Sequence, residues 1–240
     1  MSRVLPILFN TEMVRAILDG RKTVTRRCIK YKYNNTEMKM KTDKYGTCLI
    51  EIQKDVEGET YGKNPDGSTW HKLLPYIEKN PPCKKKDILY VRETWCWCPC
   101  WDCGMDTEEG CCDKTAVKFY HQKHHEYGCY GYRASFKENE EAFEGWRPSI
   151  HMPKEAARIF LKVKDVRVER LQDITEKQAE TEGINGSEVL YDGYIDAREK
   201  FAELWDSTIK KSDIEKYGWN ANPWVWVIEF ERCEKPEEWK

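Results

Sequence analysis

The sequence lacks any long hydrophobic run, because its longest apolar stretch, residues 224–228, has only five members. A helix that spans a membrane needs about 20. It also lacks an excess of either charge, since 40 Lys and Arg stand against 42 Asp and Glu. This balance excludes a uniformly basic surface but is compatible with a local basic patch. The first residues show no signal-peptide core, so we expect a soluble, cytoplasmic protein with no membrane partner.

The 240 residues are enough for one decorated domain or two small ones, without disulfide bonds. Apolar and charged residues alternate over 157–171, which predicts a long half-buried strand. Other strands are predicted at 4–9, 87–93 and 224–231, and short helices at 11–18, 176–182 and 194–210. Two irregular stretches, at about 31–82 and 95–145, are interpreted as insertions. We therefore expect one α+β domain over 1–240, a closed mixed β-barrel decorated by short helices.

Cysteine is plentiful but unevenly placed, since six of the eleven lie between Cys96 and Cys112. Their odd number and the lack of an export signal argue against a disulfide framework. Cys100 and Cys103 have the spacing of a zinc knuckle. We predict one structural zinc ion held by four thiolates; the candidates are Cys98, Cys100, Cys103, Cys111 and Cys112, with His121, His124 and His125 in reserve. The alternative is a set of reduced thiols beside packed Trp rings.

Five blocks along the chain carry a resemblance to a known family. Residues 20–27 form a Gly-x-Lys-x-x-Thr-x-Arg segment, and further blocks follow at 87–93, 146–153 (WRPSIHMP), 168–176 (VERLQDITE) and 225–230. In this order they resemble the ASCH domain family, and the blocks WRPSIHMP and VERLQDITE resemble its long phage and prophage branch. The resemblance implies a closed barrel related to the PUA fold and an association with RNA.

The family includes a small bacterial amidohydrolase that removes the acetyl group from acetylated cytidine. Lys22 and Thr25 match its catalytic Lys and Thr, and Glu182 aligns best with its catalytic Glu, with Glu180 as the fallback. The chemistry is reasonable, because a Thr hydroxyl needs a base to become a nucleophile and a neutral Lys can be that base. Burial favours the neutral amine, whereas a nearby carboxylate opposes this change.

A site that only binds is the alternative to catalysis. Lys22 would then line a groove for a phosphate or a base, and Thr25 would donate one hydrogen bond. Further candidates for contact with RNA or a nucleoside are Arg21, Arg26, Arg27, Arg92, Glu93 and Trp95. We therefore predict recognition of RNA or of a modified nucleoside, with or without hydrolytic deacylation. A protein-interaction adaptor is the third alternative.

Overall fold

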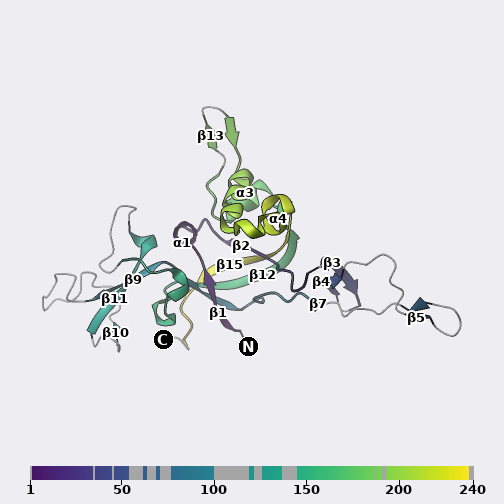
Figure 1. The fold of residues 1–240 in the computed structure, drawn as a ribbon. Helices are drawn as coiled ribbons and strands as arrows, with labels where there is room; N and C mark the ends of the chain where they lie inside the picture. Colours follow the sequence, from purple (N-terminus) through teal and green to yellow (C-terminus); the bar gives the residue numbers. More distant parts are fainter. Residues whose placement is uncertain are drawn as a thin grey trace.

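The computed structural model describes residues 2–34, 36–44, 46–53, 62–63, 69–70, 77–99, 119–121, 126–136, 145–186, 188–190 and 193–237. At its centre is a mixed sheet of five strands in the order β1-β8-β12-β15-β2 (Figure 1). These strands are β1 (Val4–Leu8), β2 (Val24–Cys28), β8 (Ile88–Arg92), β12 (Phe160–Arg170) and β15 (Trp224–Cys233). The predicted α+β class and the four predicted strands are confirmed.

Strand β15 shows why the sheet has a hydrophobic core on each face. Successive side chains of a strand point to opposite faces. Val225 and Val227 are buried in one core, while Ile228 and Phe230 are buried in the other. β12 pairs with β15 antiparallel along its length, and β1 pairs with β8 in parallel. Both faces of the central sheet are therefore covered by packed residues.

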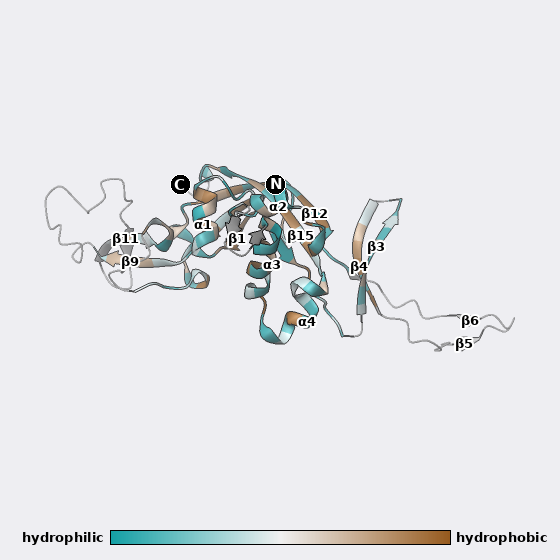
Figure 2. Ribbon diagram, turned by 90° about the horizontal axis from the view of Figure 1, so that it is seen from above, coloured by the Kyte–Doolittle hydropathy of each residue, from teal (hydrophilic) through white to brown (hydrophobic). Residues whose placement is uncertain are grey.

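Short helices cover the two faces. They are α1 (Thr11–Leu18), α2 (Glu176–Thr181), α3 (Ala197–Thr208) and α4 (Ile214–Tyr217). Val14 and Ile17 of α1 pack in the core of Phe230, and Phe201 and Trp205 of α3 pack in the core of Val227. Figure 2 shows α3 and α4 with both hydrophilic and hydrophobic residues, as expected for helices with one buried side. In the described part of the chain, no helix has the length and apolar character to cross a bilayer.

Smaller sheets fall in the two stretches that the sequence marks as insertions, and they project from opposite sides of the central sheet (Figure 1). The first contains β3 (Thr36–Asp43), β4 (Gly46–Gln53), β5 (Gly62–Lys63), β6 (Thr69–Trp70) and β7 (Ile77–Glu78). The second contains β9 (Trp95–Pro99), β10 (Phe119–His121) and β11 (Glu126–Tyr132). A further hairpin, β13 (Glu188–Leu190) and β14 (Gly193–Ile195), precedes α3. Short 3-10 helices are η1 (Arg133–Ser135), η2 (Ser149–His151), η3 (Lys154–Ala156), η4 (Leu171–Asp173), η5 (Lys211–Asp213) and η6 (Trp219–Ala221).

The predicted closure of the barrel is not confirmed. Among the described residues, the ladder of the central sheet ends at β1 on one side and at β2 on the other. The two edges meet through a side chain, because Arg27 Nη2 donates a hydrogen bond of 2.7 Å to the Leu8 carbonyl oxygen. β1 contains Pro6, which has no N–H to give to a neighbouring strand. The sheet therefore brings its edges together but leaves a seam between β1 and β2.

A buried carboxylate joins the end of β2 to the first insertion. The Glu51 side chain is fully buried and accepts hydrogen bonds from Lys32 N, Tyr33 N and the Thr36 hydroxyl, at 2.9, 3.0 and 2.6 Å. Lys79 forms an ion pair with the same carboxylate. Burial opposes its ionisation, but these donors outweigh burial and lower the pKa of Glu51 to about 2. The ionised side chain thus holds the chain as it leaves the central sheet.

Because its pKa is lower in the folded state, ionised Glu51 stabilises the protein above its ordinary pKa, and this contribution is lost as the pH falls towards about 2. We expect wild type to lose about 2 kcal/mol more stability than Glu51→Gln between about pH 6 and about pH 3. Urea unfolding at the two pH values measures the difference. Glu78→Gln, at an exposed position of β7, is the control and should keep the wild-type dependence. If wild type and Glu51→Gln lose the same stability between the two pH values, ionised Glu51 does not stabilise the folded protein.

Candidate functional site

Lys22 lies between α1 and β2, and its side chain is completely buried. Its Nζ donates to three oxygens: the Val24 carbonyl at 2.8 Å, the Glu182 carbonyl at 2.8 Å and Glu182 Oε2 at 2.7 Å. The backbones of Lys22 and Glu182 also form an isolated β-bridge. A lysine ammonium has three donors, so each of them has an acceptor. The two residues that the resemblance pairs are thus in direct contact, although 160 positions separate them.

The end of α2 is shaped to bring Glu182 to Lys22. A capping box opens this helix, with reciprocal hydrogen bonds between Thr175 and Gln178. Gly183 follows the helix at φ +90°, where a side chain is strained, and a Cβ there would lie 2.7 Å from Ala16 Cβ. The chain can therefore turn this close to α1 only with a glycine at position 183. The turn leaves the Glu182 carboxylate pointing into the protein.

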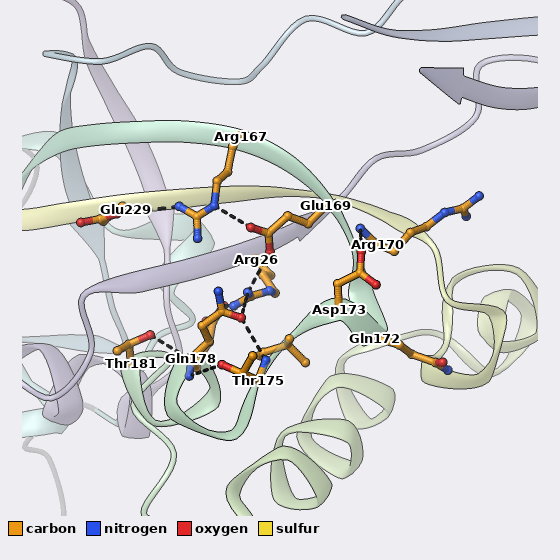
Figure 3. A network of polar contacts seen from close by, with 12 residues as sticks. Arg26, Arg167, Glu169, Arg170, Gln172, Asp173, Thr175, Gln178, Thr181 and Glu229 are labelled. Carbon is orange, nitrogen blue, oxygen red and sulfur yellow. Dashed lines mark hydrogen bonds and ion pairs between the residues drawn. The ribbon is translucent and has the colours of Figure 1, made fainter. Parts of the chain in front are cut away.

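A second buried cation shares the Glu182 carboxylate. The Arg26 side chain has no exposed surface, and its Nη1 donates to Glu182 Oε1 at 3.2 Å. Its Nη2 reaches Glu169 Oε2 at 3.1 Å and, at the outer limit of a hydrogen bond, Gln178 Oε1 at 3.5 Å. Glu169 in turn accepts a hydrogen bond from Arg167, whose side chain is partly exposed to solvent (Figure 3). Each oxygen of Glu182 thus serves a different cation, and the network ties β2 to α2 and β12.

Two features of the environment of Lys22 change its pKa in opposite directions. Burial lowers the pKa of Lys22 below its ordinary value, and the charge of Glu182 opposes this lowering. The Phe9 ring lies on another side, with its centroid 5.6 Å from Lys22 Nζ and 5.2 Å from Arg27 Cζ. Burial also lowers the pKa of Arg27. A lysine in this setting gives up its proton more readily than one on the surface, although its three acceptors suit the charged form.

Thr25 is buried on the other face of β2. It is 3% exposed and pairs with Ile228, whereas Arg26 pairs with Val227 and faces the ion-pair network. Lys22 Nζ makes its hydrogen bonds to Val24 and Glu182, not to Thr25. The structure therefore joins Lys22 to Glu182, but does not place the amine in hydrogen-bond contact with the Thr25 hydroxyl.

A cavity of about 510 Å³ occupies the seam between β1 and β2, and we call it the seam cavity. Its walls come from β1, β2, β8, β15 and residues 79–83, and they include Leu5, Leu8, Cys28, Trp226 and Ile228. Arg27 and Lys30 bring positive charge, whereas Glu51 compensates the charge of Lys79, and none of the described lining residues is acidic. Its volume is in the range of small-molecule sites. Thr25 shares a face of β2 with Arg27 and pairs with Ile228, and both of these residues line the cavity, but Thr25 itself is buried and is not a lining residue.

The other predicted contact residues are engaged in the protein itself. Arg21 donates to the Gly183 carbonyl at 2.9 Å and pairs with Asp19. Arg92 donates to the carbonyls of Met152 and Ile150.

Glu93 and Trp95 lie where the second insertion begins, and both are buried. Glu93 is 1% exposed and forms two hydrogen bonds with Arg158, of 2.9 and 3.0 Å. Trp95 is 6% exposed beneath Arg147, whose Cζ lies 5.2 Å from the Trp95 ring. Arg26, a further predicted contact residue, lies in the interior, where two carboxylates compensate its charge. Arg27, another predicted binding residue, lies in the wall of the seam cavity.

The predicted zinc site lies mostly outside the described residues, which include Cys98 but not Cys100, Cys103, Cys111 or Cys112. Cys98 is buried in β9, with its Sγ 3.6 Å from Cys96 Sγ. In the part of the chain that the structure describes, no group of three or more His, Cys, Asp or Glu is arranged to hold a metal ion. Zinc therefore stays a prediction.

Comparisons with family models, with curated proteins and with solved structures give no match for this chain. The resemblance to the ASCH family thus rests on the motifs in the sequence. Sequence reasoning missed the seam cavity and the partners of Arg26. One signal was available for the latter: Arg26 stands two positions after Val24 in a short strand, where it shares the face of a buried residue.

We expect Glu182→Gln to destabilise the protein by about 3–5 kcal/mol, because it leaves two buried cations without their shared anion. Glu180→Gln is the matched control on the same helix, and its exposed position predicts a change within about 0.5 kcal/mol. Denaturant unfolding at neutral pH measures both values. Equal losses for the two variants would show that Glu182 is not the central anion of this network.

Proposed function

We propose that this protein recognises a modified nucleoside, free or within RNA, in the seam cavity, and that its curved sheet is an ASCH domain related to the PUA barrel. The seam cavity is the observation that carries the proposal. Its apolar walls and the Trp226 ring suit a base, since every base has a flat apolar face. Arg27 and Lys30 suit the oxygen atoms of a base or a phosphate. The lack of acidic lining residues in the described part favours an electron-rich or anionic ligand.

A second candidate function is hydrolysis of an acyl group from such a nucleoside. The contact between Lys22 and Glu182, and the burial that lowers the pKa of Lys22, favour it. In this reaction the Thr25 oxygen attacks the acyl carbonyl, neutral Lys22 takes the hydroxyl proton, and the released amine receives a proton in turn. Water then hydrolyses the acyl-threonine. In the described geometry Lys22 Nζ bonds to Glu182 rather than Thr25, so the amine must first turn towards the hydroxyl.

We expect Leu8→Trp to weaken the binding of cytidine and acetylated cytidine at least about tenfold, because a larger side chain at the rim competes with the ligand for the cavity. Isothermal titration calorimetry measures the affinities. Ile150→Trp makes a similar change at an exposed apolar position outside the cavity and should bind as wild type does. If Leu8→Trp also binds like wild type, the ligand lies elsewhere.

Hydrolysis makes a separate prediction for Thr25. Thr25→Val keeps the shape of the side chain and removes the nucleophile, so it should abolish turnover of acylated nucleosides and leave their affinity within about twofold. Thr23→Val is the matched control. Wild-type turnover should rise with pH up to the lowered pKa of Lys22, because only the neutral amine accepts a proton. Mass spectrometry of the products tests this, and a wild type that leaves every acylated nucleoside intact rejects hydrolysis while binding stands.

A further inference from the structure

A second hollow lies beside the N-terminal end of the central sheet and has a volume of about 1200 Å³. Its lining includes Lys84, Lys85 and Lys86 from the turn before β8, and Lys162 and Lys164 from β12. Arg3 and three carboxylates, those of Asp87, Glu231 and Glu234, complete its charged groups. We call this hollow the lysine groove.

The charges of the lysine groove do not cancel. Asp87 is neutralised by Arg3, with 2.6 Å between Nη2 and Oδ2, and Glu231 lies 3.8 Å from Lys164. The other four lysines are exposed, and within the described residues no ion pair engages their ammonium groups; these are Lys84, Lys85, Lys86 and Lys162. The groove thus keeps a clear excess of positive charge in a chain whose net charge is −2. Such a local excess attracts anionic ligands.

The turn that carries the three consecutive lysines is held in one conformation. The buried Asp87 carboxylate accepts from Lys84 N at 2.9 Å and from Arg3 N at 3.0 Å. Burial opposes its ionisation, but the bonds from Arg3 and Lys84 outweigh burial and lower the pKa of Asp87. Lys86 has φ +77°, a conformation that favours glycine, and its N–H donates to the Val163 carbonyl at 2.9 Å. Backbone hydrogen bonds therefore hold the turn that carries these three exposed lysines.

The lysine groove and the seam cavity share one segment of the chain. Lys79, Asn80, Pro82 and Cys83 line the seam cavity, and residues 84–88 line the lysine groove. The two hollows are therefore neighbours along residues 79–88. A positively charged groove next to an apolar, ring-lined cavity is the combination that binds single-stranded nucleic acid, because the phosphates and the bases need different surfaces.

We infer that the lysine groove binds the phosphate backbone of single-stranded RNA and extends the seam cavity from a nucleoside site to a polynucleotide site. The inference rests on the proposed function for the base and on the lysines for the phosphates. A concave groove suits a strand better than a flat bilayer surface. The adjoining apolar cavity with its Trp226 ring provides a surface for a base, which a nucleic acid has and an acidic peptide lacks.

The test compares two variants that each lose three positive charges. The groove variant is Lys84→Gln/Lys85→Gln/Lys86→Gln, and the control is Lys177→Gln/Lys210→Gln/Lys211→Gln, at exposed positions outside both hollows. Fluorescence anisotropy measures binding of a labelled oligoribonucleotide of about ten nucleotides over a range of salt concentrations. We expect the groove variant to lose at least about tenfold in affinity at low salt, and its salt slope to fall by about 2. The control variant should lose little affinity.

Three outcomes overturn or divide the inference. If the groove variant binds the oligonucleotide as the control does, the lysine groove is not its site. If polyglutamate of equal length competes as well as the oligonucleotide, the groove binds any polyanion and the assignment to RNA is wrong. Titration with cytidine separates the two proposals. If wild type binds RNA through the groove lysines but does not bind cytidine, the lysine groove is supported and the seam cavity is rejected as a nucleoside site. If the groove variant loses RNA affinity and still binds cytidine, both sites are supported. The triple Lys→Arg variant should keep wild-type affinity, because it preserves the charges.

Discussion

The carboxylate of Glu182, buried between two buried cations, is the constraint on which the rest of this structure depends. One oxygen accepts from Lys22 and the other from Arg26, so the segment after α1, the end of α2 and the middle of β2 must meet at this point. Removing charges from water is costly, and only close partners with good geometry compensate for it. Neither cation can therefore leave its place without stranding a charge in the interior. This requirement fixes β2 against α2, and Gly183 provides the tight turn that it needs.

Fixing β2 in this way also determines what its opposite face can do. Side chains alternate along a strand, so Val24 and Arg26 face the ion pairs while Thr25 and Arg27 face the seam. The same five-residue strand thus provides an anchor on one side and a cavity wall on the other. Arg27 reaches across to the Leu8 carbonyl, and this bond brings the two edges of the sheet together where backbone pairing is absent among the described residues. The seam cavity is the space that remains between these edges.

Much of this arrangement follows from the sequence, but not its closing details. Four of the five strands of the central sheet are predicted from the sequence, β12 by its alternation of apolar and charged residues, whereas β2 is not; the contact between Lys22 and Glu182 agrees with the motif resemblance. Closure of the barrel could not be predicted, since it depends on whether the two edge strands, β1 and β2, pair with each other. Pro6 of β1 has no N–H to donate to such a pairing. The burial of Arg26 could not be predicted either, because a basic segment is typical of a surface loop. Its partner Glu169 lies on β12, far away in the sequence, and only the tertiary structure brings the two together. Local patterns identify elements, whereas the partners of buried charges depend on the tertiary arrangement.

Because the ion pairs and the cavity lie on opposite faces of β2, the proposed binding and the proposed catalysis make different demands on this strand. A ligand in the seam cavity meets Arg27, Trp226 and the apolar walls, none of which is part of the ion-pair network. Catalysis asks more, because Lys22 must act on Thr25 from the side where it donates to Glu182 and to the Val24 carbonyl. A neutral amine has two donors instead of three, so deprotonation of Lys22 sacrifices at least one of its buried hydrogen bonds. Of the two proposed activities, recognition would therefore need only the resting geometry, whereas hydrolysis would need a ligand that draws Lys22 towards Thr25.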